Sequence, residues 1–158
     1  RDAGLSRGLG DVYKRQIWIS LFDNINLYWS NRLDIEHLVF ENGPKRVGPF
    51  SHAVKAGEFI FITGQMPTLP ENPDVLVSND VEKQTHQVMK NLISVLDNCG
   101  SSLERVTFVR VYLVNFQDFD KVNKIYKSYF NENKLPARKC IGVTGLAVGA
   151  SVEIDLVS

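Results

Sequence analysis

Arg138 and Glu153 are the residues whose types and positions could do chemistry. Arg138 follows Pro136 closely, at the start of one predicted strand, and Glu153 lies inside another, between Val152 and Ile154. We expect both side chains on the sheet face that the helices leave uncovered. A guanidinium in such a position can hold a carboxylate through two parallel charge-assisted hydrogen bonds, each worth about 1.5–3 kcal/mol.

Spacing alone leaves two interpretations of these charges open. A sheet face in contact with water commonly carries charged residues, so Arg138 and Glu153 can be ordinary surface groups. If a second subunit covers that face, both groups lose their water and require partners. Spacing by itself favours the surface interpretation, and a chemical role needs further support.

The two strands that carry these residues alternate in polarity. In residues 138–144, one side holds Arg138, Cys140 and Gly142, and the other holds Lys139, Ile141 and Val143. In residues 151–157, one face holds Val152, Ile154 and Leu156, opposite Ser151, Glu153 and Asp155. Because successive side chains of a strand point to opposite faces, we expect the more apolar side of each strand to pack against helices.

Other segments of the chain are predicted to be strands or turns. A β-branched and aromatic run between Gly57 and Gly64 predicts a buried strand over residues 59–63. Residues 105–114 form a longer run that carries apolar side chains on both faces of a predicted strand. This pattern indicates a central strand or a second covered surface. The prolines of residues 67–73 indicate a turn, since proline lacks a backbone donor.

Two amphipathic helices complete the predicted fold. The first begins after Asn79, with Glu82 as its capping-box partner, and ends at Gly100. Asp118 caps the second, whose apolar stripe extends to Phe130. The resulting element order lets both helices cover one face of one mixed sheet. We therefore predict a two-layer α+β sandwich.

Length and composition limit the function classes. A chain of 158 residues suits one domain rather than two. Its 18 basic and 18 acidic residues balance, so we expect neither nucleic acid nor a membrane as a partner. Cys99 and Cys140 are too few for a disulfide framework, and the three histidines are scattered, so we predict no metal site.

The chain divides into three predicted segments. Residues 1–16 have no periodicity and look like translated sequencing-adapter DNA, so we treat them as a foreign segment. Residues 17–40 are rich in aromatic residues but show no clear period, and their role stays open. The apolar run of residues 17–22 is much shorter than the ~20 residues that cross a bilayer. We expect a cytoplasmic protein whose domain comprises residues 41–158.

A series of short motifs runs through this predicted domain. They read VGPFSHAV (47–54), FITGQMP (61–67), QT (84–85), NL (91–92), GSSL (100–103), DF (118–119) with Asn123 and Tyr126, PARKC (136–140) and VEID (152–155). Each motif alone is weak. Together and in this order, they resemble the YjgF/RidA family of reactive intermediate deaminases, the Rid family.

The resemblance implies a structure and a set of site residues. Members of the Rid family are chorismate-mutase-like α+β subunits that form homotrimers, with active sites at the interfaces and no metal or organic cofactor. By resemblance, Arg138 binds the substrate carboxylate and Glu153 orients or activates the hydrolytic water. The main chain of Cys140 contacts the nitrogen side of the substrate. The remaining substrate-binding positions are Phe50, Thr63 and Asn123.

The reaction that the resemblance implies is hydrolysis of 2-aminoacrylate-type enamines, through 2-iminobutanoate-like or 2-iminopropanoate-like imines, to 2-keto acids and ammonia. Three residues depart from the family pattern, because Phe50 replaces Tyr, Thr63 replaces Ser, and Lys139 replaces Ser or Thr. They leave open an alternative, a non-catalytic trimer that binds metabolites or other proteins. RNA cleavage is a third hypothesis, which the balanced charge disfavours.

Overall fold

The computed structural model describes residues 34–158, and the predictions for residues 1–33 lie outside the described residues. Within this range, six strands form one sheet in the order β1-β2-β3-β8-β6-β7. Their bounds are Ile35–Leu38 (β1), Ala53–Ala56 (β2), Phe59–Gln65 (β3), Phe108–Leu113 (β6), Ala137–Gly142 (β7) and Val152–Val157 (β8). β6 and β7 are parallel, whereas the other neighbours are antiparallel, so the sheet is mixed.

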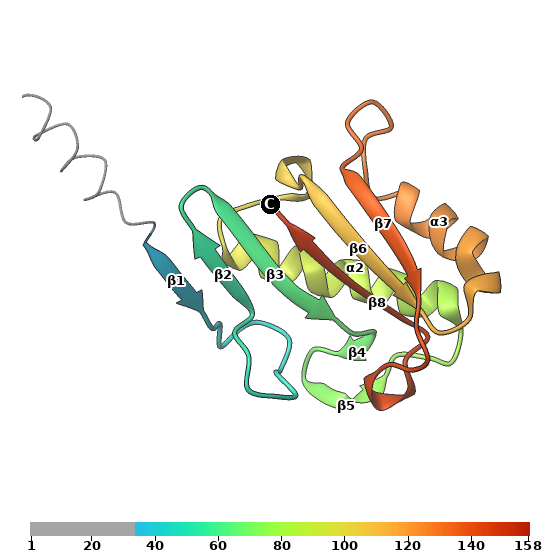
Figure 1. Ribbon diagram of the computed structural model, residues 1–158. Coiled ribbons are helices and arrows are strands. Elements are labelled where there is room, and N and C mark those ends of the chain that lie inside the picture. The colour runs from blue at the N-terminus through green and yellow to red at the C-terminus, as the bar shows by residue number, and fades with distance from the viewer. Residues whose placement is uncertain (1–33) are drawn as a thin grey trace, which may run out of the picture. The chain divides into compact units, whose positions relative to one another are not determined.

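The α-helices of the described residues, α2 (Val81–Asn98) and α3 (Phe119–Lys127), lie on the same face of the sheet (Figure 1). The core between the two layers is built from alternate strand residues and from one stripe of each helix. It includes Val109, Val111, Leu113, Val152, Ile154 and Leu156 of the sheet and Val88, Met89, Leu92, Val95, Leu96 and Val122 of the helices. The predicted two-layer α+β sandwich is confirmed. No helix in this part of the chain has the length and apolar character of a membrane span.

The two ends of α2 correct one prediction and confirm another. Asp80, not Asn79, is the N-cap, because its side chain accepts a hydrogen bond from the backbone N–H of Lys83 at 2.9 Å. Glu82 lies in the first turn, where a negative charge is favourable to the helix dipole. Gly100 follows the helix with a φ of 69°, a left-handed conformation that costs glycine little.

Several other boundaries differ from the predicted ones. The segment 67–73 contains part of a small antiparallel hairpin, β4 (Thr68–Leu69) and β5 (Asn72–Leu76), rather than a turn alone. β6 begins at Phe108, three residues later than predicted, because Leu103–Arg105 forms a short 3₁₀ helix. β1 lies in a segment for which the sequence predicts no element, and it pairs with β2.

Replacing Asp80 by alanine removes the acceptor that caps α2. We expect Asp80→Ala to lower the free energy of unfolding by about 0.5–2 kcal/mol. Asn79→Ala is the matched control and should change it by less than about 0.5 kcal/mol. Urea unfolding followed by circular dichroism measures both. A larger loss for Asn79→Ala than for Asp80→Ala would contradict the assigned cap.

Candidate functional site

Arg138 lies on the helix-covered face of the sheet, so the prediction that it shares the uncovered face with Glu153 is wrong. In the parallel ladder Arg138 pairs with Val109, which is buried in the core beneath the helices. Glu153 pairs with Tyr112, which lies three residues after Val109 on β6 and so points to the opposite face of the sheet. Glu153 therefore lies on the face without helices. The physical reason is register: β7 follows the alternation of β6, and this places the more polar side of β7 toward the helices.

Arg138 belongs to a group of residues that we call the arginine half-site: Arg138, Cys140, Asn123 and Tyr126. The guanidinium carbon of Arg138 lies 4.8 Å from the centroid of the Tyr126 ring and 5.8 Å from that of Phe119, so it rests on aromatic faces of α3. A cavity of about 480 Å³ opens beside it, lined by Asn123, Tyr126, Lys127, Leu135, Pro136 and Arg138. No ion pair among the described residues involves Arg138, which leaves its N–H donors free for a ligand.

The neighbours of Arg138 along β7 have different surroundings. Burial raises the pKa of the Cys140 thiol, and the charge of Arg138 opposes that shift. A thiol that stays protonated is a poor nucleophile, which agrees with a predicted role for the main chain of Cys140. Lys139 has the opposite parity and pairs with Arg110, so this departure from the family pattern lies outside the arginine half-site.

Glu153, on the uncovered face, belongs to a second group of neighbouring residues that we call the glutamate half-site: Glu153, Gly64, Phe50 and Thr63. A Cβ added at Gly64 would overlap the Glu153 carboxyl group, whose Cδ would be only 2.9 Å away. A glycine inside a strand often marks such a close approach. Gly64 and Phe50 line one small cleft. Thr63 Oγ1 donates a hydrogen bond to the Ser51 carbonyl at 2.7 Å, which ties β3 to the loop that carries Phe50.

The charge state of Glu153 depends on its surroundings. Burial, and secondly the negative charge of Asp155, raises the pKa of the Glu153 carboxyl. Asp155 lies further along the same face and accepts hydrogen bonds from Arg110 Nε at 2.6 Å and from the Tyr112 hydroxyl at 3.0 Å. A raised pKa brings a carboxyl group closer to the neutral range, where it can both accept and release a proton.

The structure thus brings the predicted site residues together as two groups on opposite faces. Three contact residues were not assigned a role from the sequence: Gly64, Tyr126 and Phe119. The position of Gly64 within a strand is a signal for close approach, although it does not identify the partner. Tyr126 and Phe119 lie on an apolar helix stripe, which core packing explains equally well. Within residues 34–158, no cluster of three or more His, Cys, Asp or Glu side chains could hold a metal ion.

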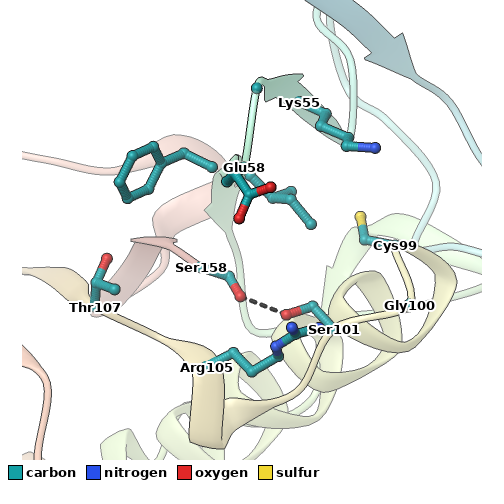
Figure 2. A pocket seen from close by; sticks show the side chains of 11 residues that line it. Lys55, Glu58, Cys99, Gly100, Ser101, Arg105, Thr107 and Ser158 are labelled. Carbon is teal, nitrogen blue, oxygen red and sulfur yellow. Dashed lines mark hydrogen bonds between the residues drawn. The ribbon is translucent and has the colours of Figure 1, made fainter.

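Another cavity of about 480 Å³, shown in Figure 2, contains none of the predicted site residues. Its walls mix basic and acidic side chains, Lys55, Arg105 and Glu58. Burial raises the pKa of the Cys99 thiol on its wall, so this sulfur is a poor nucleophile. The hydroxyls of Ser101 and Ser158 hydrogen-bond to each other. The charges and nucleophiles of this cavity therefore do not select one kind of ligand.

Gly64→Ala should displace Glu153 while leaving the fold in place, because the added methyl group overlaps only the flexible end of that side chain. We expect the Glu153 pKa, which burial raises in the parent, to fall toward its ordinary value as the carboxyl moves into water. Carbon-detected NMR titration measures it. Gly145→Ala, where a Cβ meets open space, is the control and should leave it unchanged. An unaltered Glu153 pKa in Gly64→Ala would refute the close approach.

Comparisons with known proteins place the chain in a family. The family model described as Endoribonuclease L-PSP matches residues 40–158. A RutC family protein of Pyrococcus horikoshii is 42% identical over 123 residues, which cover 78% of this chain and 96% of that protein. The solved structure of the Rid family protein YyfA from Yersinia pestis is similar with a TM-score of 0.74 and 34% identity, covering 79% of this chain and 98% of that one. The structure of E. coli TdcF with bound serine has a TM-score of 0.71 and 25% identity, covering 78% and 97%. The chain therefore belongs to the Rid family, also called the YjgF/RidA/RutC family.

Proposed function

We propose that this chain hydrolyses 2-aminoacrylate-type enamines, through their imine tautomers, to 2-keto acids and ammonia. The observation that supports this most directly is the complementary chemistry of the two half-sites. One offers a guanidinium, with no ion-pair partner among the described residues, that can bind a carboxylate. The other offers a carboxyl group of raised pKa that can move a proton. Membership of the Rid family agrees with this chemistry.

The proposal requires more than one copy of the chain, because the half-sites of one copy lie on opposite faces of its sheet. The arginine half-site of one copy must meet the glutamate half-site of the next. A head-to-tail contact of this kind uses two different surfaces, and it closes into a ring when the rotation between copies fits. The proposed assembly is a ring of three copies, as the family resemblance implies.

The side of the sheet without helices, the open face, is suited to such a contact. Val157 pairs with Phe61 on one side and with Phe108 on the other, so the three side chains form an apolar row across β3, β8 and β6. Phe59 and Phe61 are 53% and 47% exposed. Contiguous exposed apolar side chains commonly mark interaction surfaces. A copy that covers the open face also excludes water from Glu153.

Arg138 binds and orients the substrate in this proposal. Its planar guanidinium donates two parallel hydrogen bonds to the carboxylate, which fixes the plane of the imino acid. The solved TdcF structure holds serine, a small amino acid with a carboxylate of the same kind. Holding the imine carbon next to a bound water converts an encounter in solution into a positioned reaction.

Glu153 then acts as the proton carrier. It accepts a proton from the bound water while the water oxygen bonds to the imine carbon, and the electron pair of the C=N double bond moves onto nitrogen. The Glu153 carboxyl returns the proton to that nitrogen. Glu153 then takes the proton of the intermediate's hydroxyl and passes it to the amino group, so the C–N bond breaks, ammonia leaves and the oxygen becomes the carbonyl of the keto acid. The raised pKa of Glu153 suits both steps.

Single substitutions test the two roles separately. With enzymatically generated 2-aminoacrylate, Arg138→Ala should lower kcat/KM by roughly 100-fold or more, because the paired charge-assisted hydrogen bonds are lost. Glu153→Gln, which cannot accept the proton, should lower kcat by roughly 100- to 10,000-fold. Ammonia and keto-acid release are measured.

Lys124→Ala, on the exposed side of α3, is the control for Arg138→Ala and should keep the parental rate. An Arg138→Ala variant as fast as the parent would refute the assigned role of Arg138. Keto-acid binding without any rate above buffer would instead favour the non-catalytic module.

RNA cleavage is the second candidate, because the matching family model is described as an endoribonuclease. The 18 basic and 18 acidic residues of the chain argue against a general phosphate-binding surface. Measuring RNA affinity at increasing salt separates the two candidates. A flat salt dependence excludes phosphate-driven RNA binding, whereas affinity that falls steeply with salt, together with cleavage, would support the endoribonuclease.

A further inference from the structure

Tyr126 of α3 lies against Arg138, and the proposed reaction does not use it. Its side chain is only 4% exposed, and its ring centroid lies 4.8 Å from the Arg138 guanidinium carbon. Its hydroxyl is buried and has no hydrogen-bond partner within the described part of the chain. Because the hydroxyl has no partner, the group of Tyr126 that can act on Arg138 is the ring, whose face lies beside the guanidinium.

We propose that the aromatic face of Tyr126 is a platform that holds the Arg138 guanidinium in position to bind the substrate carboxylate. Tyr126 is then a positioning residue, which acts through Arg138 and does not touch the substrate. The carboxylate ligand in this statement rests on the proposed function, but the platform itself can be tested without it.

The geometry explains why an aromatic ring suits this task better than an acidic residue. An arginine side chain has about 2 kcal/mol of rotamer entropy, so an exposed guanidinium is poorly oriented unless something holds it. A carboxylate would hold it by occupying its N–H donors, whereas the face of an aromatic ring attracts the cation and leaves the in-plane donors free. The Arg138 donors have no ion-pair partner among the described residues, as this role requires.

The ring itself is held firmly. Tyr126 packs against Phe130, with centroids 4.7 Å apart and planes tilted by 35°. Phe119 offers a second, more distant face, 5.8 Å from the Arg138 guanidinium carbon. Burial raises the pKa of Tyr126 to about 12, so the hydroxyl stays neutral and adds no phenolate charge beside Arg138. These contacts assign the positioning role to the ring and not to the hydroxyl.

Two substitutions at Tyr126 separate the ring from the hydroxyl. Tyr126→Phe keeps the ring, and we expect its dissociation constant for 2-oxobutanoate, measured by calorimetry, to stay within about twofold of the parent. Tyr126→Met fills the space without a π face, and we expect roughly 3- to 30-fold weaker binding. In steady-state kinetics the loss should appear in KM more than in kcat, because Arg138 contacts the carboxylate throughout the reaction.

Tyr129→Met is the matched control, since Tyr129 contacts His86 and not Arg138. It should leave 2-oxobutanoate binding unchanged. If Tyr126→Phe weakens binding as much as Tyr126→Met does, the hydroxyl is the active group and the platform is wrong. If Tyr126→Met binds 2-oxobutanoate as tightly as the parent does, the platform is also wrong.

The Arg138 Nε–Hε resonance gives a readout that requires no substrate. Above the Tyr126 ring, its proton should be shifted upfield by the ring current in the parent and in Tyr126→Phe, and in Tyr126→Met the shift should fall to the smaller contribution of the more distant Phe119 ring. An unshifted signal in the parent would overturn the platform, even if Tyr126→Met does not fold. If the shift is present but the parent neither binds keto acids nor hydrolyses imines, the proposed function fails while the platform stands.

Discussion

Side-chain alternation along β-strands places Arg138 and Glu153 on opposite faces of one sheet, and the proposed site follows from that constraint. β6 fixes both positions, since Val109 pairs with Arg138 and Tyr112, of opposite parity, pairs with Glu153. A change of rotamer cannot carry a side chain through a hydrogen-bonded sheet. The two groups of one copy therefore cannot meet around a small substrate, and a shared site needs Arg138 from one copy and Glu153 from another.

The two half-sites meet different physical requirements. Arg138 has to present its guanidinium in one orientation, and the rings of α3 provide a surface for that. In the proposed reaction Glu153 gains and loses a proton, and burial together with Asp155 raises its pKa. Arg110 and Tyr112 hold Asp155 in place. Lys139 lies beside Arg110 on the open face, so its departure from the family pattern lies on the opposite side of the sheet from the arginine half-site.

Sequence periodicity predicts which residues share a face of a strand, but not which side of the sheet that face occupies. The helix stripes and the alternation of β8 are clear, and the two-layer sandwich follows from them. On β7, Ile141 has the sequence pattern of a core residue, yet it is 36% exposed on the open face. An apolar side chain covered by another copy and one covered by a helix give the same alternation in the sequence, so the alternation alone cannot distinguish them. In the same way, Asn79 and Asp80 both suit an N-cap, and only the backbone conformation decides between them.

Mixed assemblies test the shared site most directly. Arg138→Ala and Glu153→Gln copies each form only defective sites, but a site is intact where a copy that retains Arg138 faces a copy that retains Glu153. In rings assembled at random from equal amounts, about a quarter of the sites meet this condition, so we predict recovery of about a quarter of the parental keto-acid release. Mixing Arg138→Ala with the double variant should recover none. An equal mixture of the two single variants that stays as inactive as each alone would contradict a site shared between copies.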